Sequence, residues 1–196
     1  MDVMAVSPPT RDRLIDAGAE LFRRQGYTGT GVKQILAEAR APFGSMYHHF
    51  PGGKAELGAE AVRRSGRLYA LVVAEAMAGD APLADRIESS FRQAAETMRQ
   101  SDWADACPIA TVALEVSGSS EPLRAACAEV FEEWFAGCTA LFAAGGVPAE
   151  RAPDLAVQML CALEGAFVFC RALRRPEPLH VAGAGVAATV RDAVSA

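Results

Sequence analysis

Residues that can bind phosphates and base edges gather between Thr30 and Leu57. A nucleic-acid site needs cations and hydrogen-bond donors for the phosphates, together with side chains that reach the bases. Lys54 stands at the expected start of a helix, where backbone amides can join its ammonium in holding a phosphate. Lys33 supplies a second cation, although a plain solvated charge is the alternative interpretation. These residue types make the stretch a candidate nucleic-acid site.

Two short helices with a tight break between them must position these side chains. Apolar residues recur at helical spacing over residues 32–39, and Thr30 before them can act as an N-cap. Pro42 breaks the pattern, because proline lacks an N–H and disfavours helix in the residue before it. A second short helix is predicted over residues 43–50, ended by residues 51–53. This is a helix-turn-helix candidate, whose second helix can enter the DNA major groove.

The same stretch resembles the DNA-binding domain of TetR-family transcriptional repressors. The residues that carry the resemblance are Gly26, Tyr27, Thr30, Val32, Ile35, Ala39, Gly44, Tyr47, His49, Phe50, Lys54 and Leu57. The variant H-H-F-P-G-G-K, with one more residue before Lys54 than is usual, looks like the LmrA/YxaF-type subgroup. The resemblance implies a double-stranded DNA operator, contacted by Thr30, Val32, Lys33, Ala41, Pro42, Phe43, Gly44, Ser45, Tyr47, His48, His49 and Lys54.

Some of these side chains have a second interpretation. Phe43 can touch a thymine methyl group or pack locally. Tyr47 and Phe50 favour the core, with the Tyr47 hydroxyl able to point outward. We expect His49 to pack and cap rather than to contact DNA. Adjacent residues point to different helix faces, so His48 and His49 are not expected to chelate a metal, and we predict no metal site.

The whole chain predicts an all-α protein without a cofactor. Alanine is abundant, β-branched runs are scarce, and 51% of the 196 residues are hydrophobic, enough for a sizeable core. The net charge of −5 divides into +3 over residues 1–67 and −8 over residues 68–196. A mildly basic N-terminal segment on an acidic body is compatible with DNA binding by that segment alone.

About nine helices and two domains are expected. The predicted helices cover residues 11–25, 30–39, 43–50, 54–77, 82–100, 108–116, 120–144, 148–174 and 179–194. Thr10 can cap the first of these, and Gly66 should weaken the fourth. Residues 1–53 form the expected helix-turn-helix domain, with an arm over residues 1–9. Residues 54–196 form a larger effector-binding and dimerisation domain.

The last two helices are candidates for a dimer interface. The helix over 148–174 is apolar almost all round, so it should be buried on more than one side, and small residues over 179–194 permit close approach of another helix. The resemblance implies a homodimer through this pair. The core of a monomer is the alternative.

The resemblance also implies that the second domain binds a small hydrophobic effector. Aromatic and apolar residues that could line its pocket are Tyr69, Phe91, Met98, Trp103, Val112, Phe131, Trp134, Phe135 and Phe167. Polar candidates are Arg92, Gln93, Glu115, Gln158 and Glu164. Each aromatic residue can equally be ordinary core.

Several other classes of protein find little support. We find no G-x-S-x-G, phosphate loop or H-E-x-x-H motif, and three histidines offer few bases, so no enzyme is expected. Five cysteines without C-x-x-C spacing argue against disulfides and zinc. The N-terminus lacks the features of a signal peptide, and we expect neither a spanning helix nor a membrane partner, hence a cytoplasmic protein.

The sequence therefore predicts a sequence-specific DNA-binding repressor, released from a palindromic operator by a small hydrophobic or aromatic ligand. One alternative is a protein-interaction module that has the helix-turn-helix shape without operator binding. Another is a redox sensor based on Cys107, Cys161 or Cys170, although buried structural cysteines are the simpler interpretation.

Overall fold

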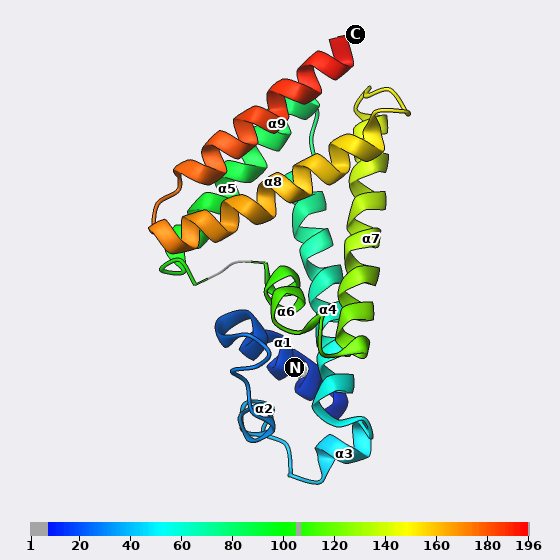
Figure 1. Ribbon diagram of the computed structural model, residues 1–196, viewed down its shortest axis with the longest axis vertical. Helices are drawn as coiled ribbons and strands as arrows, with labels where there is room; N and C mark the ends of the chain where they lie inside the picture. Colours follow the sequence, from blue (N-terminus) through cyan, green and yellow to red (C-terminus); the bar gives the residue numbers. More distant parts are fainter. Residues whose placement is uncertain (1–7, 105–106, 196) are drawn as a thin grey trace, which may run out of the picture. The chain divides into compact units, whose positions relative to one another are not determined.

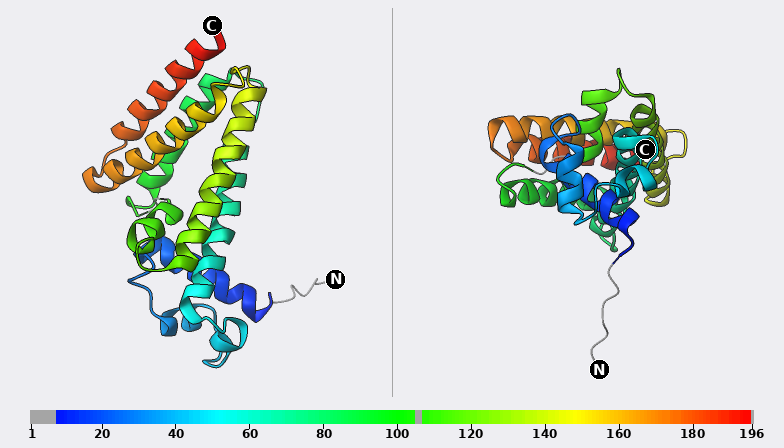
Figure 2. Two further views of the ribbon diagram at one scale, coloured as in Figure 1. Left: turned by 45° about the vertical axis from the view of Figure 1, so that its right-hand side comes forward. Right: turned by 90° about the horizontal axis from the view of Figure 1, so that it is seen from below.

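The computed structural model describes residues 8–104 and 107–195, and all regular elements in these ranges are α-helices (Figures 1 and 2). They are α1 (Thr10–Gln25), α2 (Val32–Glu38), α3 (Ser45–His49), α4 (Gly53–Ala76), α5 (Leu83–Gln100), α6 (Pro108–Val116), α7 (Glu121–Ala144), α8 (Ala152–Leu173) and α9 (Glu177–Ser195). The all-α prediction is confirmed within the described ranges. The predicted arm over residues 1–9 lies mostly outside them.

The chain divides into two compact units. Unit 1 comprises the described residues up to Ser65 together with Pro108–Cys127, and unit 2 comprises the described residues of Gly66–Cys107 and Ala128–Ala196. Helices α4 and α7 each contribute residues to both units. The two units are defined by which residues pack together and not by function, so the functional boundary at residue 53 stays a prediction.

The ends of α8 and α9 differ from the predicted ranges. Residues before α8 form a turn in which Arg151 N–H and Ala152 N–H both donate to the Pro148 carbonyl, at 2.9 and 3.0 Å, so α8 begins four residues later than expected. Helix α9 begins at Glu177, because Pro178 fits the first turn, where its missing N–H leaves no bond unmade.

Both predicted threonine caps are wrong. The residue before α1 is Pro9, and the Thr10 hydroxyl instead accepts a hydrogen bond from Arg13 Nη2 at 3.2 Å. The Thr30 hydroxyl donates backward to the Gly26 carbonyl at 2.7 Å, so it is not directed at α2. Gly31 holds the N-cap position of α2, and its N–H donates to Gln34 Oε1 at 2.7 Å.

Unit 1 is built around the first three helices. Leu14 and Phe22 of α1, Ile35 of α2, Met46 of α3 and Leu57 of α4 are almost completely buried, so each of these four helices contributes buried apolar residues. The apolar spacing that predicted α1 and α2 is the spacing of these buried residues. Buried apolar residues from each of its helices therefore stabilise the helix-turn-helix.

Unit 2 is built around α5, α8 and α9, and α9 lies along α5 and beside α8 (Figures 1 and 2). Phe91 of α5 and Leu179 of α9 are buried in its core. A Cβ at Gly183 of α9 would lie 2.5 Å from the Phe91 Cβ, so only glycine lets the two helices approach this closely. The prediction that small residues of the last helix admit a neighbour is confirmed, and the neighbour is α5.

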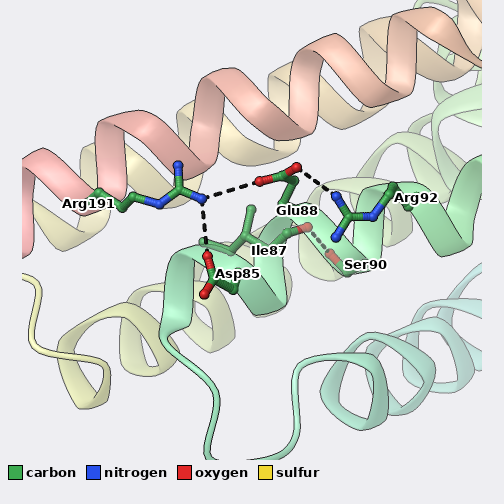
Figure 3. A network of polar contacts seen from close by, with 6 residues as sticks. All are labelled: Asp85, Ile87, Glu88, Ser90, Arg92 and Arg191. Atoms are coloured by element: carbon green, nitrogen blue, oxygen red, sulfur yellow. Dashed lines mark hydrogen bonds and ion pairs between the residues drawn. The ribbon is translucent and has the colours of Figure 1, made fainter.

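The exposed edge between α5 and α9 carries a network of ion pairs (Figure 3). Arg191 Nη2 of α9 donates to Asp85 Oδ1 at 3.1 Å and to Glu88 Oε2 at 3.3 Å, and Arg92 Nη1 donates to Glu88 Oε1 at 2.6 Å. Arg92 thus points along the surface of α5 toward a carboxylate. Exposed pairs of this kind stabilise a protein only modestly, so the buried α5–α9 contact is the main source of cohesion.

Gly66 has a packing role that its helix propensity does not suggest. A Cβ at this position of α4 would lie 2.5 Å from Val130 Cγ1 of α7. The Gly66 carbonyl also accepts a hydrogen bond from Trp134 Nε1 at 3.0 Å. The glycine therefore permits close contact between α4 and α7 within unit 2, in addition to the helix weakening that the sequence predicted.

Helix α8 is long and apolar enough, by length and composition alone, to cross a membrane. The sequence analysis expected no spanning helix, so this property of α8 was not predicted. A core helix of a soluble protein passes the same test, and α8 packs against α9 and α5. One such helix is weak support for a membrane span.

Candidate functional site

The turn between α1 and α2 leads the chain into the first helix of the helix-turn-helix. Gly26 has a φ of +76°, a left-handed conformation that favours glycine. The Thr30 hydroxyl, buried at 1% exposure, donates to the Gly26 carbonyl and accepts from Gln25 Nε2 at 3.2 Å. Thr30 therefore holds this turn together from inside, and a direct DNA contact by its side chain does not follow from this geometry.

Lys54 is engaged in the same turn. Its ammonium donates to the Tyr27 carbonyl at 2.7 Å and lies 3.9 Å from the centroid of the Tyr27 ring. Burial lowers the pKa of Lys54, and the nearby Glu115 carboxylate partly opposes that shift. The Glu115 carboxylate also accepts a hydrogen bond from Thr28 N–H at 2.8 Å. Lys54 and Glu115 thus fix the backbone of the turn, and a phosphate contact by Lys54 stays a prediction.

The turn between α2 and α3 closes with two backbone hydrogen bonds. Arg40 N–H donates to the Ala37 carbonyl at 3.1 Å, and Ala41 N–H donates to the Leu36 carbonyl at 2.9 Å. This is the Schellman arrangement, in which the residue after the C-cap is left-handed and is usually glycine. Here that residue is Arg40, with a φ of +48°. The predicted break before Pro42 is confirmed.

The outer face of this turn and of α3 presents the candidate DNA-contacting residues. Phe43 is 65% exposed and Tyr47 is 57% exposed, so neither belongs to the core of unit 1. The prediction that Tyr47 packs in the core is wrong, because Met46 of α3 and Phe50, the residue after this helix, are the ones directed inward. The other exposed candidates are Lys33, Pro42, Gly44 and His48, and the half-buried ones are Val32, Ala41, Ser45, His49 and Lys54.

The rings of His48 and His49 are in contact with each other. Their ring centroids lie 4.8 Å apart with an interplanar angle of 68°, an edge-to-face contact. His48 is exposed and His49 is half-buried, so the expectation that they point to different helix faces stays a prediction. Within residues 8–104 and 107–195, no group of three or more metal-ligating side chains is found.

A cavity of about 550 Å³ lies within unit 2. Five of the predicted pocket residues line it, namely Tyr69, Phe91, Met98, Trp134 and Phe167. Residues that the sequence reading missed include, among others, Val73, Met77, Ser90, Thr97, Cys107, Glu133, Cys138, Leu141, Met159, Leu160 and Leu163. Many of them share a helical face with a predicted residue, such as Val73 and Met77 with Tyr69, so helical spacing was the signal that could have found them.

The other predicted pocket residues lie away from this cavity. Trp103 and Phe135 pack against the core of unit 2, and Phe131 makes an edge-to-face contact with Trp134 at a centroid distance of 5.9 Å. Val112 is buried in unit 1. Their apolar character reflects packing, which sequence spacing cannot distinguish from a cavity wall.

The polar candidates divide in the same way. Gln93 and Glu164 line the cavity, whereas Arg92, Glu115 and Gln158 do not. Burial raises the pKa of the Glu164 carboxyl to about 7, although a hydrogen bond with the Cys107 side chain partly offsets the shift. The cavity is therefore a largely apolar space with two carboxyl groups in its wall, those of Glu164 and Glu133.

The cysteines show little sign of reactivity. All five are free, and only Cys161 is exposed. Burial raises the pKa of Cys127 and of Cys138 to about 11, and it also raises the pKa of Cys170. Because the thiolate is the reactive form, these three thiols are poorly suited to redox sensing.

Helices α8 and α9 expose apolar side chains on the surface of unit 2. Val157, Val168, Phe169 and Leu173 of α8 and Val181 of α9 are each between 43% and 71% exposed. A group of large apolar residues on one helix pair is unusual for the surface of a monomer and is typical of an interface.

Comparison with known proteins identifies the family. Residues 14–61 match the family of bacterial regulatory proteins described as the tetR family, and residues 83–185 match the LmrA/YxaF-like transcriptional regulator C-terminal domain. The HTH-type transcriptional regulator LmrA of Bacillus subtilis (strain 168) is 31% identical over 170 residues, which cover 87% of this chain and 90% of LmrA.

Two further matches agree with this. An uncharacterized HTH-type transcriptional regulator of Mycobacterium tuberculosis (strain ATCC 25618 / H37Rv) is 35% identical over 176 residues, covering 87% of this chain and 89% of its own length. The crystal structure of regulatory protein TetR from Rhodobacter sphaeroides superimposes with a TM-score of 0.77 and 31% identity over 91% of this chain and 97% of that one. This chain therefore belongs to the TetR family of transcriptional regulators, with a C-terminal domain of the LmrA/YxaF-like kind.

Proposed function

We propose that this regulator is a sequence-specific repressor, which a small hydrophobic ligand in the unit 2 cavity releases from a palindromic operator. The observation that carries the proposal is the outer face of α3 and of the turn before it. Phe43, Tyr47 and His48 are exposed there on a helix-turn-helix whose inward positions are filled by core residues. Large aromatic side chains left in solvent on such a face need a partner, and a base edge or sugar–phosphate backbone suits them.

Each exposed side chain has a role that its chemistry suggests. Lys33 and Arg40 would bind phosphates, and neither makes a salt bridge within the described part of the chain. The Tyr47 hydroxyl would donate to a phosphate, while Ser45 and His48 would reach base edges. Phe43 would contact a thymine methyl group, which is the main apolar feature of the major groove.

The remaining candidates would either allow the backbone to approach the duplex or stabilise the turns of the helix-turn-helix. Val32, Ala41, Pro42 and Gly44 are small or apolar and would let the backbone approach the duplex. Thr30, His49 and Lys54 would keep the two turns in place, with Lys54 retaining N–H donors for a phosphate. An ammonium has three donors, and the Tyr27 carbonyl occupies one of them.

A homodimer would place two such faces on one palindrome. The exposed apolar residues of α8 and α9 support this arrangement, because burial against a second copy would remove them from water. A partner on this surface also accounts for the apolar character of α8 without a membrane.

We infer from operator binding that the protein acts in the cytoplasm.

Release requires that the ligand bind more tightly to the arrangement that cannot hold DNA. A tenfold loss of DNA affinity corresponds to about 1.4 kcal/mol of differential ligand binding. The buried surface available in a cavity of about 550 Å³ can supply this.

The test is binding to the intergenic DNA beside the gene, measured by fluorescence anisotropy over a salt series. We expect sequence preference and a steep salt dependence. Lys33→Ala should weaken binding and reduce the salt slope by roughly one. Arg175→Ala removes an exposed arginine from unit 2 and is the control, which should leave DNA affinity and the salt slope unchanged. Equal binding to unrelated DNA at low salt would favour the protein-interaction alternative and overturn the proposal.

A further inference from the structure

The charged groups of the unit 2 cavity are all of one sign. Its described lining contains no lysine, arginine or histidine, and its two charged residues are Glu164 on α8 and Glu133 on α7. A site that binds acids would be expected to present a cation or a helix N-terminus. The charge pattern therefore selects against anionic ligands.

Glu164 lacks a cationic partner within the described part of the chain. Its side chain is partly buried, and it shares a hydrogen bond with the side chain of Cys107. A carboxylate in an apolar wall loses much of its hydration, so an incoming cation would recover electrostatic energy there. Burial raises the pKa of this carboxyl to about 7, as expected for a group that lacks a counter-charge.

The rest of the wall suits an aromatic or bulky apolar body. Tyr69, Phe91, Trp134 and Phe167 line the cavity, and the faces of such rings attract cations as well as stacking on other rings. The volume of about 550 Å³ lies in the range of drug-sized ligands. Gln93 adds an uncharged polar group on the α5 side.

We propose that the cavity binds a lipophilic amine, an apolar and preferably aromatic body with one protonated nitrogen, and that the Glu164 carboxylate receives this nitrogen. Glu133, which is exposed, strengthens the negative potential of the site. The proposal rests on the effector role proposed for the cavity and specifies the chemical class of that effector.

This assignment predicts how binding depends on pH. An ammonium binds the ionised form of Glu164, so affinity should rise between pH 6 and pH 8, by up to about tenfold for a carboxyl of pKa about 7. The other ionisable residues of the wall are Tyr69 on α4, Glu133 and Cys138 on α7, and Cys107. Helix α5 contributes none. Burial keeps the pKa of Cys138 near 11, outside this window.

The test uses three ligands with one shared body: diphenylpropylamine, diphenylpropanol and diphenylpropanoate. Isothermal titration calorimetry with the full-length protein at pH 8 should give at least tenfold tighter binding for the amine than for the alcohol, and the weakest binding for the carboxylate. Glu164→Gln should remove most of the preference for the amine and its pH dependence. Glu132→Gln is the matched control, because Glu132 is an exposed glutamate beside Glu133 on α7 and does not line the cavity.

A second readout separates this inference from the effector proposal. Release of operator DNA is measured with the same ligands by fluorescence anisotropy. If the alcohol or the carboxylate binds and releases DNA as well as the amine does, the amine inference is overturned and the effector role stands. If the amine binds with the expected preference but leaves DNA affinity unchanged, the effector role fails instead. Should none of the three bind, both are overturned. Thermal unfolding of Glu164→Gln verifies that the variant is folded.

Discussion

Arg40 offers a quantitative test of the turn that orients α3. This residue has a φ of +48° at the position where a Schellman turn usually holds glycine. A left-handed conformation costs a residue with a side chain about 1–2 kcal/mol. Glycine avoids this cost, but its greater conformational freedom stabilises the unfolded chain by about 0.5–1 kcal/mol and so offsets part of the gain. Arg40→Gly should therefore stabilise unit 1 by roughly 0.5–1 kcal/mol.

The measurement needs a comparison that keeps the charge change constant. Arg40→Gly and Arg40→Ala remove the same exposed guanidinium, but only glycine removes the left-handed cost. We expect urea denaturation to give a higher midpoint for Arg40→Gly than for Arg40→Ala. Hydrogen exchange should show greater protection of the Ala41 amide, which donates to the Leu36 carbonyl. Equal stability of the two variants would refute the assignment of strain to Arg40, whatever happens to DNA binding.

Four other predictions test the packing and the charges. Gly66→Ala should destabilise by about 1–3 kcal/mol in thermal unfolding, because the added Cβ would lie 2.5 Å from Val130 Cγ1, and Val130→Ala should relieve part of that loss. Lys54→Met should cost about 1–2 kcal/mol by removing a hydrogen bond and a ring contact, and an unchanged melting temperature would contradict the role of Lys54 in the turn. The folded-state pKa of Glu164 is raised from 4.5 to about 7, so stability should fall as pH rises between these values, and Glu164→Gln should flatten that part of the curve in pH-dependent melting experiments. Phe169→Asp should convert a dimer into monomers in light scattering without loss of helix content, and a persistent dimer would exclude this surface of α8 as the interface.

The helix-turn-helix could be predicted from sequence because its signals are local. The apolar spacing over residues 32–39, the break at Pro42 and the glycines after Pro51 each depend on neighbours within a few residues. The same kind of reasoning failed at Thr10 and Thr30. A hydroxyl that can cap a helix can also bond to another partner, and the choice depends on turn geometry that sequence spacing does not specify.

Tyr47 shows a second limit of local patterns. An aromatic residue in a short apolar helix favours burial, but α3 has only five residues and can direct few of them inward. Met46 of α3 and Phe50, which follows the helix, are the buried residues here, four residues apart. Tyr47 was therefore left exposed by competition for a small interior, which is a property of the bundle and not of the residue.

The cavity was only half predictable for a related reason. Aromatic residues at helical spacing line a cavity wall or fill a core with the same pattern, so Phe91 and Phe135 could not be told apart until their neighbours were known. Glu164 carried a clearer signal. A single carboxylate in the otherwise apolar middle of α8 is costly to bury, and sequences retain such a group where something compensates the cost. Because no cation of the described chain lies beside it, the compensation must come from protonation, which its raised pKa expresses, or from a bound cation. The calorimetric comparison of amine, alcohol and carboxylate distinguishes these two cases.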